Sequence, residues 1–459
     1  MDRDHELMHV ENGPIGPTLL HFAFPVLLSQ ILQELYNVAD CMVVGHFGGA
    51  YALAAVGVSG TMLSVLIKFF IGFSSGVSVV TSRLFGERSY DRLRKTMTSV
   101  FRMVIVLGSV FSLAGVLGAE WTLRKLSCPE EVLGSAALYL KICAAGLGAQ
   151  MVYNTGSAIL RSYGDTRSPF RFYLVSVLSN IGLDLLLAAG LHMGVAGAAA
   201  ATLISQWLLA VMILRHLFRL NENCALRLRG EGLSAGKLRE VLHTGLPAGM
   251  QALFMSLSSI LIQTGINHFG AHAMAGMTLY AKVEGVLYLP TFAYGIALTG
   301  FIGQNLGAGR LDRVEEAVHI SLKTMAAVIL PLSLLLTAAS PVLLRVFTRD
   351  AMDIYFAREA ILFNLPVYVV YAVNQVYLGA IKGLGDTSYP MICTLFCYSV
   401  FRVIWCAALI PVFESMRVVY LSYDVSFFLM TAMLIPMYRR RFRMAAGRTA
   451  QTRGDFAVL

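Results

Sequence analysis

The chain contains two matching halves, and this duplication limits its fold more than any other feature. Gly164-Asp165-Thr166 recurs as Gly385-Asp386-Thr387, with an offset of 221 residues between the two aspartates. Other pairs share an offset of 221 or 222: Gly86 and Gly307, Asp91-Arg92 and Asp312-Arg313, Pro25 and Pro247, His46-Phe47-Gly48 and His268-Phe269-Gly270. So long a period excludes a solenoid. In an apolar chain it predicts a duplicated helix bundle that holds something between its halves.

The composition indicates a membrane protein. Of the 459 residues, 57% are hydrophobic and 14% are charged, whereas soluble domains carry about 25% charged residues. Apolar runs at 104–117, 174–191, 325–336 and 418–437 reach the ~20 residues of a transmembrane helix with their flanks. The N-terminal segment is acidic-rich and lacks the basic start of a signal peptide, so we expect the first span to remain in the mature protein.

The net charge of +9 follows the loops rather than forming a nucleic-acid patch. Basic residues gather in alternate connections, whereas those near 45–51, 190–195 and 267–277 carry no Arg or Lys. This is the positive-inside pattern, which predicts a plasma-membrane protein with both termini in the cytoplasm. Because the basic residues are spread over separate loops, we expect no nucleic-acid partner.

Hydropathy predicts an all-α membrane protein of about twelve transmembrane helices. An even number in each half makes the repeats parallel, as two pseudo-symmetric six-helix lobes. We expect an N-lobe at 1–217 that carries a cation site, a cytoplasmic linker at 218–240, a C-lobe at 241–438 and a basic cytoplasmic tail at 439–459. The predicted spans are 18–44, 54–82, 98–118, 134–159, 169–190, 196–217, 241–266, 278–303, 320–342, 360–381, 390–411 and 418–438.

Polar side chains recur inside the apolar spans of the first half. Asp40 follows Asn37 in the first span, and Asn180 precedes Asp184 by one helical turn in the fifth. A carboxylate at membrane depth costs ~2.5–3.5 kcal/mol on insertion scales, so such a residue usually faces a cavity or a partner. Alternatively, both acids lie at span ends and contact water. In the second half, the positions that match them are Ile262 and Trp405.

Two carboxylates close together in a low dielectric cannot both ionise cheaply, so they would share a proton or a bound cation. Oxygen atoms of carboxylates, amides and hydroxyls suit a small hard cation. The first half therefore predicts a site for H⁺ or Na⁺. Lys282 and Glu284 in the eighth span are two residues apart, and a structural ion pair explains them as well as a coupling role.

Two other patterns have structural interpretations. Pro25 shares a span with Asp40, and a proline inside a helix allows a kink there. Gly383-Leu384-Gly385-Asp386 contains the GxGD string of intramembrane aspartyl proteases, but its basic surroundings and its repeat partner at Asp165 favour a turn or helix cap. No metalloprotease, serine hydrolase or Walker A string occurs, so we expect neither an enzyme nor ATP-driven transport by this chain alone.

This layout resembles the multidrug and toxic compound extrusion (MATE) family, most closely its prokaryotic DinF-like branch. The resemblance covers nearly the whole chain and is carried by the order and duplication of its motifs. These are 24–45 in the first span, Leu160-Arg161-Ser162-Tyr163-Gly164-Asp165-Thr166, Gly245-Leu246-Pro247-Ala248, Gly303-Gln304-Asn305-Leu306-Gly307-Ala308-Gly309 and Gly383-Leu384-Gly385-Asp386-Thr387.

The resemblance implies two six-helix lobes that alternate access and no catalytic residues. It implies an N-lobe cation site, which would be a metal site if the ion is Na⁺, and a bend of the first helix at Pro25. Another branch carries an acid in the seventh helix, at about Met255 here, so no C-lobe cation site of that kind is implied. The residues matching the N-lobe site are Asp40, Asn154, Asn180, Asp184 and Thr202.

Together these observations predict a secondary active exporter of small amphipathic or cationic organic compounds, driven by inward H⁺ or Na⁺ and needing no other cofactor. We expect a monomer in the lipid bilayer. Aromatic and Met side chains would suit varied organic cations, and the candidates for a substrate cavity are Tyr36, Asn37, Tyr139, Tyr153, Met255, Gln263 and Gln375. The alternatives are a lipid-linked oligosaccharide flippase of the same superfamily and a non-transporting membrane receptor or scaffold.

Overall fold

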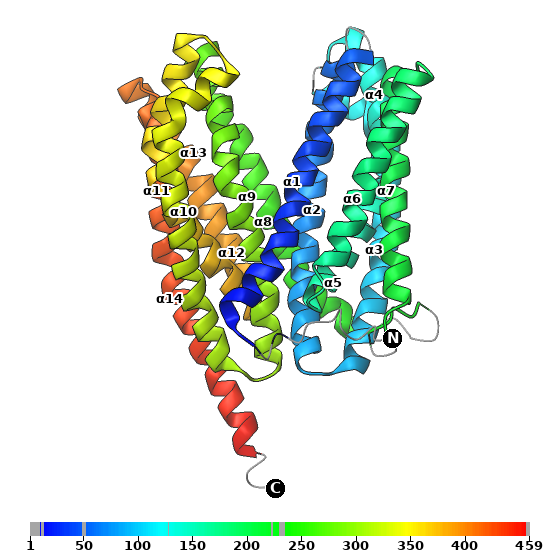
Figure 1. Cartoon of the computed structure of the whole chain (residues 1–459), viewed down its shortest axis with the longest axis vertical. Coiled ribbons are helices and arrows are strands. Elements are labelled where there is room, and N and C mark those ends of the chain that lie inside the picture. The colour runs from blue at the N-terminus through cyan, green and yellow to red at the C-terminus, as the bar shows by residue number, and fades with distance from the viewer. Residues whose placement is uncertain are drawn as a thin grey trace. The chain divides into compact units, whose positions relative to one another are not determined.

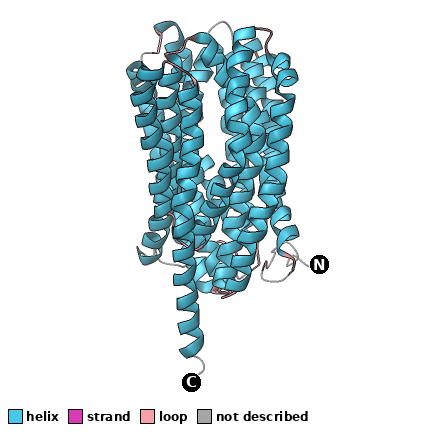
Figure 2. Cartoon of the chain, turned by 90° about the vertical axis from the view of Figure 1, so that its left-hand side faces the viewer, coloured by secondary structure: helices cyan, strands magenta, loops and turns pink. Residues whose placement is uncertain are grey.

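The computed structural model describes residues 10, 13–47, 52–126, 128–221, 224–228 and 235–455, without the side chains of 235 and 448–455. Within these ranges the chain is helical apart from short connections, and contains no strand (Figure 2). Backbone groups have no partners in lipid other than one another, which is why the spanning elements are helices. The predicted all-α class is confirmed.

The helices form two compact units, coloured along the chain in Figure 1. Unit 1 comprises the described residues of 25–249, and unit 2 comprises residue 10, the described part of 13–24 and residues 250–455. The helices of unit 1 are α2 (Ala52–Gly86), α3 (Tyr90–Lys125), α4 (Glu130–Ala144), α5 (Leu147–Ser162), α6 (Arg167–Asp184), the π-helical segment η2 (Leu185–Gly190) and α7 (Gly194–Phe218).

Unit 2 repeats this order. Its last helix continues past the neighbouring helices of the unit (Figure 1), so the residues predicted as a tail from 439 onward continue a helix to residue 455. The helices of unit 2 are α9 (Ala271–Gly307), α10 (Leu311–Phe347), α11 (Ala351–Gly383), α12 (Ser388–Thr394), the π-helical segment η3 (Leu395–Val400), α13 (Phe401–Phe413) and α14 (Arg417–Asp455).

Two helices belong partly to each unit. Helix α1 (Ile15–Phe47) is divided between Phe24 and Pro25, and α8 (Ala235–Asn267) between Gly249 and Met250. Each division lies at or within three residues of a helix proline, Pro25 or Pro247. The compact units are thus divided inside helices, whereas the sequence-based boundaries at 217/218 and 240/241 follow the long connection.

The described helices agree with the twelve predicted spans. Eleven are long and apolar enough to cross a membrane, and α4 with α5 forms a twelfth that is bent by 43°. The bend lies between Ala144 and Leu147, at Ala145-Gly146. A span predicted as one helix is therefore broken near its middle. Hydropathy did not reveal the break because both parts are apolar.

The duplicated Gly-Asp motif forms the same turn in each unit. Gly164 and Gly385 have φ of 90° and 94°, a region that favours glycine because it has no Cβ. The carboxylate of Asp165 accepts a hydrogen bond from Ser168 N at 2.8 Å, and that of Asp386 accepts from Ser388 N at 3.1 Å. Both aspartates therefore cap the following helix, as expected from the sequence.

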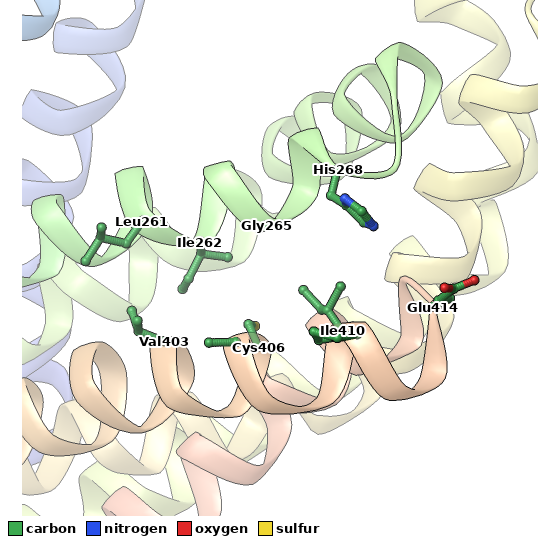
Figure 3. Close-up of a pocket in the computed structure, with 10 residues that line it drawn as sticks. Leu261, Ile262, Gly265, His268, Val403, Cys406, Ile410 and Glu414 are labelled. Carbon is green, nitrogen blue, oxygen red and sulfur yellow. The ribbon is translucent and has the colours of Figure 1, made fainter.

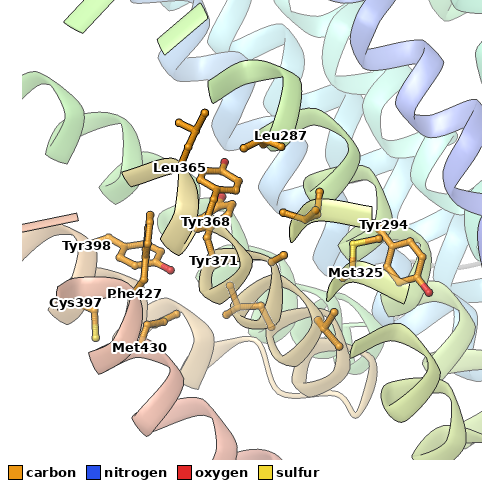
Figure 4. Packing of buried hydrophobic residues seen from close by; sticks show 14 of the residues in the cluster. Leu287, Tyr294, Met325, Leu365, Tyr368, Tyr371, Cys397, Tyr398, Phe427 and Met430 are labelled. Carbon is orange, nitrogen blue, oxygen red and sulfur yellow. The ribbon is translucent and has the colours of Figure 1, made fainter. Parts of the chain in front are cut away.

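Each unit has its own apolar core. In unit 1, Gly76 packs so closely on α8 that a Cβ there would clash with Gly245 and Thr244, as is common where small residues bring membrane helices together. In unit 2, aromatic side chains fill the space between α11 and α14, where Tyr371 and Phe427 have ring centroids 5.2 Å apart (Figure 4). These packed cores hold the polar side chains described next.

Candidate cation-binding site

Asp40 is a buried carboxylate on a helix whose neighbouring positions are largely exposed. Its side chain is 6% exposed, whereas Asn37 and Val38 on the same turn are exposed. Tyr139 of α4 donates a hydrogen bond to Asp40 Oδ2 at 3.0 Å, and Oδ1 has no partner. One carboxylate oxygen is therefore free to bind a ligand.

Asp184 and Asn180 form a second polar pair, one turn apart on α6. Both side chains are fully buried, and neither the two carboxylate oxygens nor the two amide atoms have a hydrogen-bond partner. A buried polar group without a partner costs about 1–3 kcal/mol, and more when it is charged. Asp184 is also the last α-helical residue before the π-helical segment η2, and π-helical turns are frequent at functional sites.

The two carboxylates belong to one electrostatic environment. Asp184 interacts electrostatically with Asp40, although they lie on α6 and α1. Cys143 of α4 interacts with both and is buried. Like charges this close, without a counter-charge, favour binding of a proton or a cation.

Hydroxyl and amide groups from α1, α5 and α7 complete the polar part of unit 1. Tyr36 OH donates to Thr202 Oγ1 at 3.0 Å, and Tyr36 interacts electrostatically with Asp40. Near the bend between α4 and α5, a Cβ at Gly146 would clash with Gln206 Oε1, an oxygen that has no partner. The break of the fourth span is thus packed against the same helix that carries Thr202.

These contacts bring together four of the five residues that the sequence predicted as the cation site. Asp40 and Asp184 interact directly, Asn180 shares a helix face with Asp184, and Thr202 is joined through Tyr36. Asn154 of α5 is buried with its amide nitrogen unpartnered, and its membership of the site remains a prediction.

The predicted substrate-cavity residues are divided between the units, so their common role remains a prediction. Tyr36 and Tyr139 instead contact the predicted cation site. Tyr153 OH donates to Pro169 O at 3.4 Å in unit 1, and Asn37 is exposed. In unit 2, Met255 packs on the core, Gln263 donates to Asn267 Oδ1 at 3.0 Å, and Gln375 donates to Tyr371 OH at 2.8 Å.

Sequence reasoning missed the contribution of α4. Tyr139 was assigned to the substrate, although it donates to Asp40, and Cys143 was taken as an apolar packing residue. The two lie four residues apart and therefore share a helix face. That spacing was available in the sequence, but nothing in it shows that this face meets Asp40, 99 residues earlier.

The donor set fits a small hard cation or a proton. The unpartnered atoms include three carboxylate oxygens, from Asp40 and Asp184, and the amide oxygen of Asn180. Oxygen ligands of this kind suit Na⁺, whereas thiolate or imidazole ligands would suit a transition metal. Protonation of one carboxylate would also relieve the repulsion between the two acids.

Unit 2 contains an apolar pocket of about 430 Å³ between α8 and α13. Leu261 and Ile262 face Val403 and Cys406 across it, and His268 and Glu414 lie toward one end (Figure 3). Its polar groups lie at that end rather than converging on its centre. The pocket therefore lacks the arrangement that would bind an ion.

Three metal-ligating side chains gather at the start of α11, but local structure accounts for them. His272 Nδ1 lies 2.8 Å from Asp353 Oδ1 and 3.5 Å from Asp350 Oδ1. Asp350 caps α11 by accepting hydrogen bonds from the backbone N–H groups of Asp353 and Met352, which lower its pKa. His272 and Asp350 are exposed, so an ion pair and a helix cap explain this cluster.

Comparison with known proteins identifies the family. The chain is 26% identical to "Probable multidrug resistance protein YoeA" of Bacillus subtilis, with 82% of each chain covered. It is 28% identical to a protein named "FAD transporter" of Shewanella oneidensis, over 68% of this chain and 70% of that one. A solved outward-facing MATE family transporter has a TM-score of 0.87 at 21% identity, covering 96% of this chain and 99% of that one.

A family profile described as MatE matches the chain twice, at residues 25–186 and 247–407. The two matches start 222 residues apart, which is the offset seen in the sequence and confirms the duplication. They also fall on corresponding helices, α1 to α6 and α8 to α13. The chain therefore belongs to the MatE family, the multidrug and toxic compound extrusion transporters, and is a multi-pass membrane transporter rather than an enzyme.

Proposed function

We propose that this transporter exports small amphipathic or cationic organic compounds in exchange for H⁺ or Na⁺, by alternating access. The observation that carries the proposal is the pair of buried acids Asp40 and Asp184. They interact electrostatically and have three oxygens without partners. A bare pair of carboxylates is expensive in an apolar unit, so the site favours binding of a cation.

Ion binding would act on the helices that carry the two acids. A cation or proton held between Asp40 and Asp184 removes their repulsion and joins α1 to α6. Asp40 lies on the same helix as Pro25, where α1 passes from one compact unit to the other. A change of charge at Asp40 can therefore be transmitted along α1 to the proline, where the missing hydrogen bond allows bending.

The relatives support an organic substrate. Several are named as multidrug resistance or multidrug export proteins, and efflux of amphipathic compounds is the activity that we infer for this chain. We further propose that both termini are cytoplasmic, that the plasma membrane is the site of action, and that the functional unit is a monomer. The positive-inside distribution of basic loops supports the orientation.

A second substrate class follows from the relative named "FAD transporter", which is 28% identical to this chain. FAD is a large anionic dinucleotide, so its export would need a cavity with a different charge from one that accepts organic cations. The two substrates can be compared directly in one preparation.

Reconstituted transport tests the proposal. Proteoliposomes are loaded with ethidium or FAD, and efflux is measured after a ΔpH or a Na⁺ gradient is imposed separately. We expect one gradient to accelerate ethidium efflux, and expect Asp40→Asn and Asp184→Asn to abolish that acceleration. The matched control is Asp91→Asn, which removes an acid with an 84% exposed side chain and should transport normally. Gradient-driven efflux that persists in both site variants would reject the assigned site.

A further inference from the structure

Unit 2 contains a separate set of buried charges that does not balance. Asp424 of α14 and Arg402 of α13 are each 8% exposed, and Glu284 of α9 is partly buried. Arg402 interacts electrostatically with both acids. Two carboxylates and one guanidinium leave one net negative charge when all three are ionised. We call Glu284, Arg402 and Asp424, with their polar neighbours Tyr280, Asn364 and Tyr368, the unit 2 acid cluster.

Arg402 is fixed in place by groups other than the two acids. Its Nε donates to Ser426 Oγ at 2.8 Å. Its guanidinium carbon lies 4.1 Å from the ring centroid of Tyr423, 4.7 Å from that of Tyr398 and 5.4 Å from that of Phe427. Such contacts stabilise a buried cation without neutralising it through a carboxylate. Between described residues, Arg402 forms no direct salt bridge with either acid, and Asp424 Oδ1 has no hydrogen-bond partner.

Oxygen atoms converge on Glu284 from two helices. The hydroxyl groups of Tyr280 on α9 and Tyr368 on α11 lie beside its carboxylate, and Asn364 of α11 lies beside Tyr280. Both hydroxyls and both amide atoms of Asn364 are buried and lack a partner of hydrogen-bond geometry. Several unsatisfied groups in one place, each worth about 1–3 kcal/mol, indicate that something else binds them.

The spacing of these residues directs them to one point. Tyr280 and Glu284 are four residues apart on α9, and Asn364 and Tyr368 are four residues apart on α11, so each pair shares a helix face. Helices α9 and α11 pack extensively against each other. Figure 4 shows Tyr368 on the same face of α11 as Leu365, near Leu287 of α9. The two faces therefore form a single group of oxygen donors inside the packed core.

We propose that the unit 2 acid cluster binds a monovalent cation, with Glu284, Asn364, Tyr280 and Tyr368 as the ligands. All four offer oxygen atoms, which suit a hard cation such as Na⁺. A single positive charge balances the excess left by Glu284, Asp424 and Arg402, whereas a divalent ion would exceed it. A water molecule would satisfy the hydroxyl groups and leave the charge uncompensated. This site goes beyond the proposed function, which uses Asp40 and Asp184 alone.

Direct ion binding to the purified full-length chain tests the inference. Equilibrium ²²Na⁺ binding is measured in lipid nanodiscs at pH 8 for the wild type, Glu284→Gln, Asp184→Asn and the double variant. Because the readout is binding, it does not depend on the transport cycle. We expect Glu284→Gln to lower the number of bound Na⁺ per chain by one, whether or not Asp184 is present. The matched control Glu316→Gln, an exposed acid on α10, should bind as the wild type does.

Failure of this site can be told apart from failure of the site in unit 1. If Glu284→Gln binds as much Na⁺ as the wild type, the unit 2 site is overturned, whatever Asp184→Asn does. If Asp184→Asn alone abolishes all Na⁺ binding, it is overturned as well. Should Glu284→Gln fail to give folded protein, Asn364→Ala replaces it, since it removes an amide ligand without altering any charge. With that variant we expect Na⁺ affinity to fall at least tenfold, and unchanged affinity would contradict the inference.

Discussion

At the scale of single residues, the account depends on which polar atoms have partners. Asp40 has one carboxylate oxygen occupied by Tyr139, whereas Asp184 and Asn180 have none of their polar atoms occupied. The sequence could predict these three positions because an acid or amide in an apolar span is rare and costly. It could not predict the donor on Asp40, because a contact between α1 and α4 leaves no local pattern in the chain.

Removal of that donor has a predictable direction. In Tyr139→Phe the ionised form of Asp40 loses a hydrogen bond, so the site should hold its coupling ion more tightly and release it more slowly. A hydrogen bond to a charged group is worth about 1.5–3 kcal/mol, so the half-saturating ion concentration should fall roughly tenfold or more. Ion titrations of transport in proteoliposomes measure it. Tyr163→Phe, whose hydroxyl contacts Met97 Sδ, should leave the half-saturating concentration unchanged, and a rise in it for Tyr139→Phe would contradict this role.

Asp350 provides a pH-dependent test of the fold. Backbone N–H groups of Asp353 and Met352 lower its pKa in the folded chain, so its contribution to stability is complete above the carboxyl pKa of the unfolded chain, about 3.9. That contribution is lost as pH falls through the lower folded value. We therefore expect Asp350→Ala to lower the melting temperature at pH 7 and to match the wild type in strong acid. Asp350→Asn keeps a capping side chain and should fall between them at pH 7.

At the scale of elements, irregular helices position the site. The fourth span bends by 43° between α4 and α5, and the fifth changes from α-helix to π-helix directly after Asp184. Hydropathy predicted the existence of both spans but neither irregularity, because average hydrophobicity over ~20 residues does not depend on the hydrogen-bond register. In contrast, the Gly-Asp turns at Gly164 and Gly385 were predictable, because glycine at positive φ followed by a capping aspartate is a local signal.

The packing of η2 against α7 yields a stability prediction. A Cβ at Gly197 would lie 2.8 Å from Ala188 N and from Leu187 C, so Gly197→Ala must push α7 away from the segment that follows Asp184. Overpacking of this kind costs about 1–3 kcal/mol. Thermal unfolding should show a lower melting temperature for Gly197→Ala. It should be equal or higher for Gly134→Ala, where a Cβ meets no atom within 4 Å. Equal melting temperatures for the two variants would contradict the close packing at Gly197.

At the scale of the whole molecule, the duplication could be recognised before the fold was known. The offset of 221 to 222 residues, the hydropathy pattern and the parallel orientation followed from the sequence, and the double match of the family profile confirms the repeat. The difference between the halves was harder to predict. Ile262 and Trp405 replace the two acids in the second half, which suggested that unit 2 lacks ion chemistry. The structure instead gathers Glu284, Arg402 and Asp424 there, from three helices, and no sequence spacing predicts that meeting.

The central claim is that the acids of unit 1 bind the ion that drives export, and coupled ion movement tests it most directly. Proteoliposomes are loaded with ethidium at equal ion concentrations on both sides, and ion entry is followed with a pH-sensitive dye or with ²²Na⁺. The account predicts that outward flow of ethidium draws one of these ions inward in the wild type, and that Asp184→Asn abolishes this entry. Ethidium-driven ion entry that is equal in the wild type and in Asp184→Asn would contradict it.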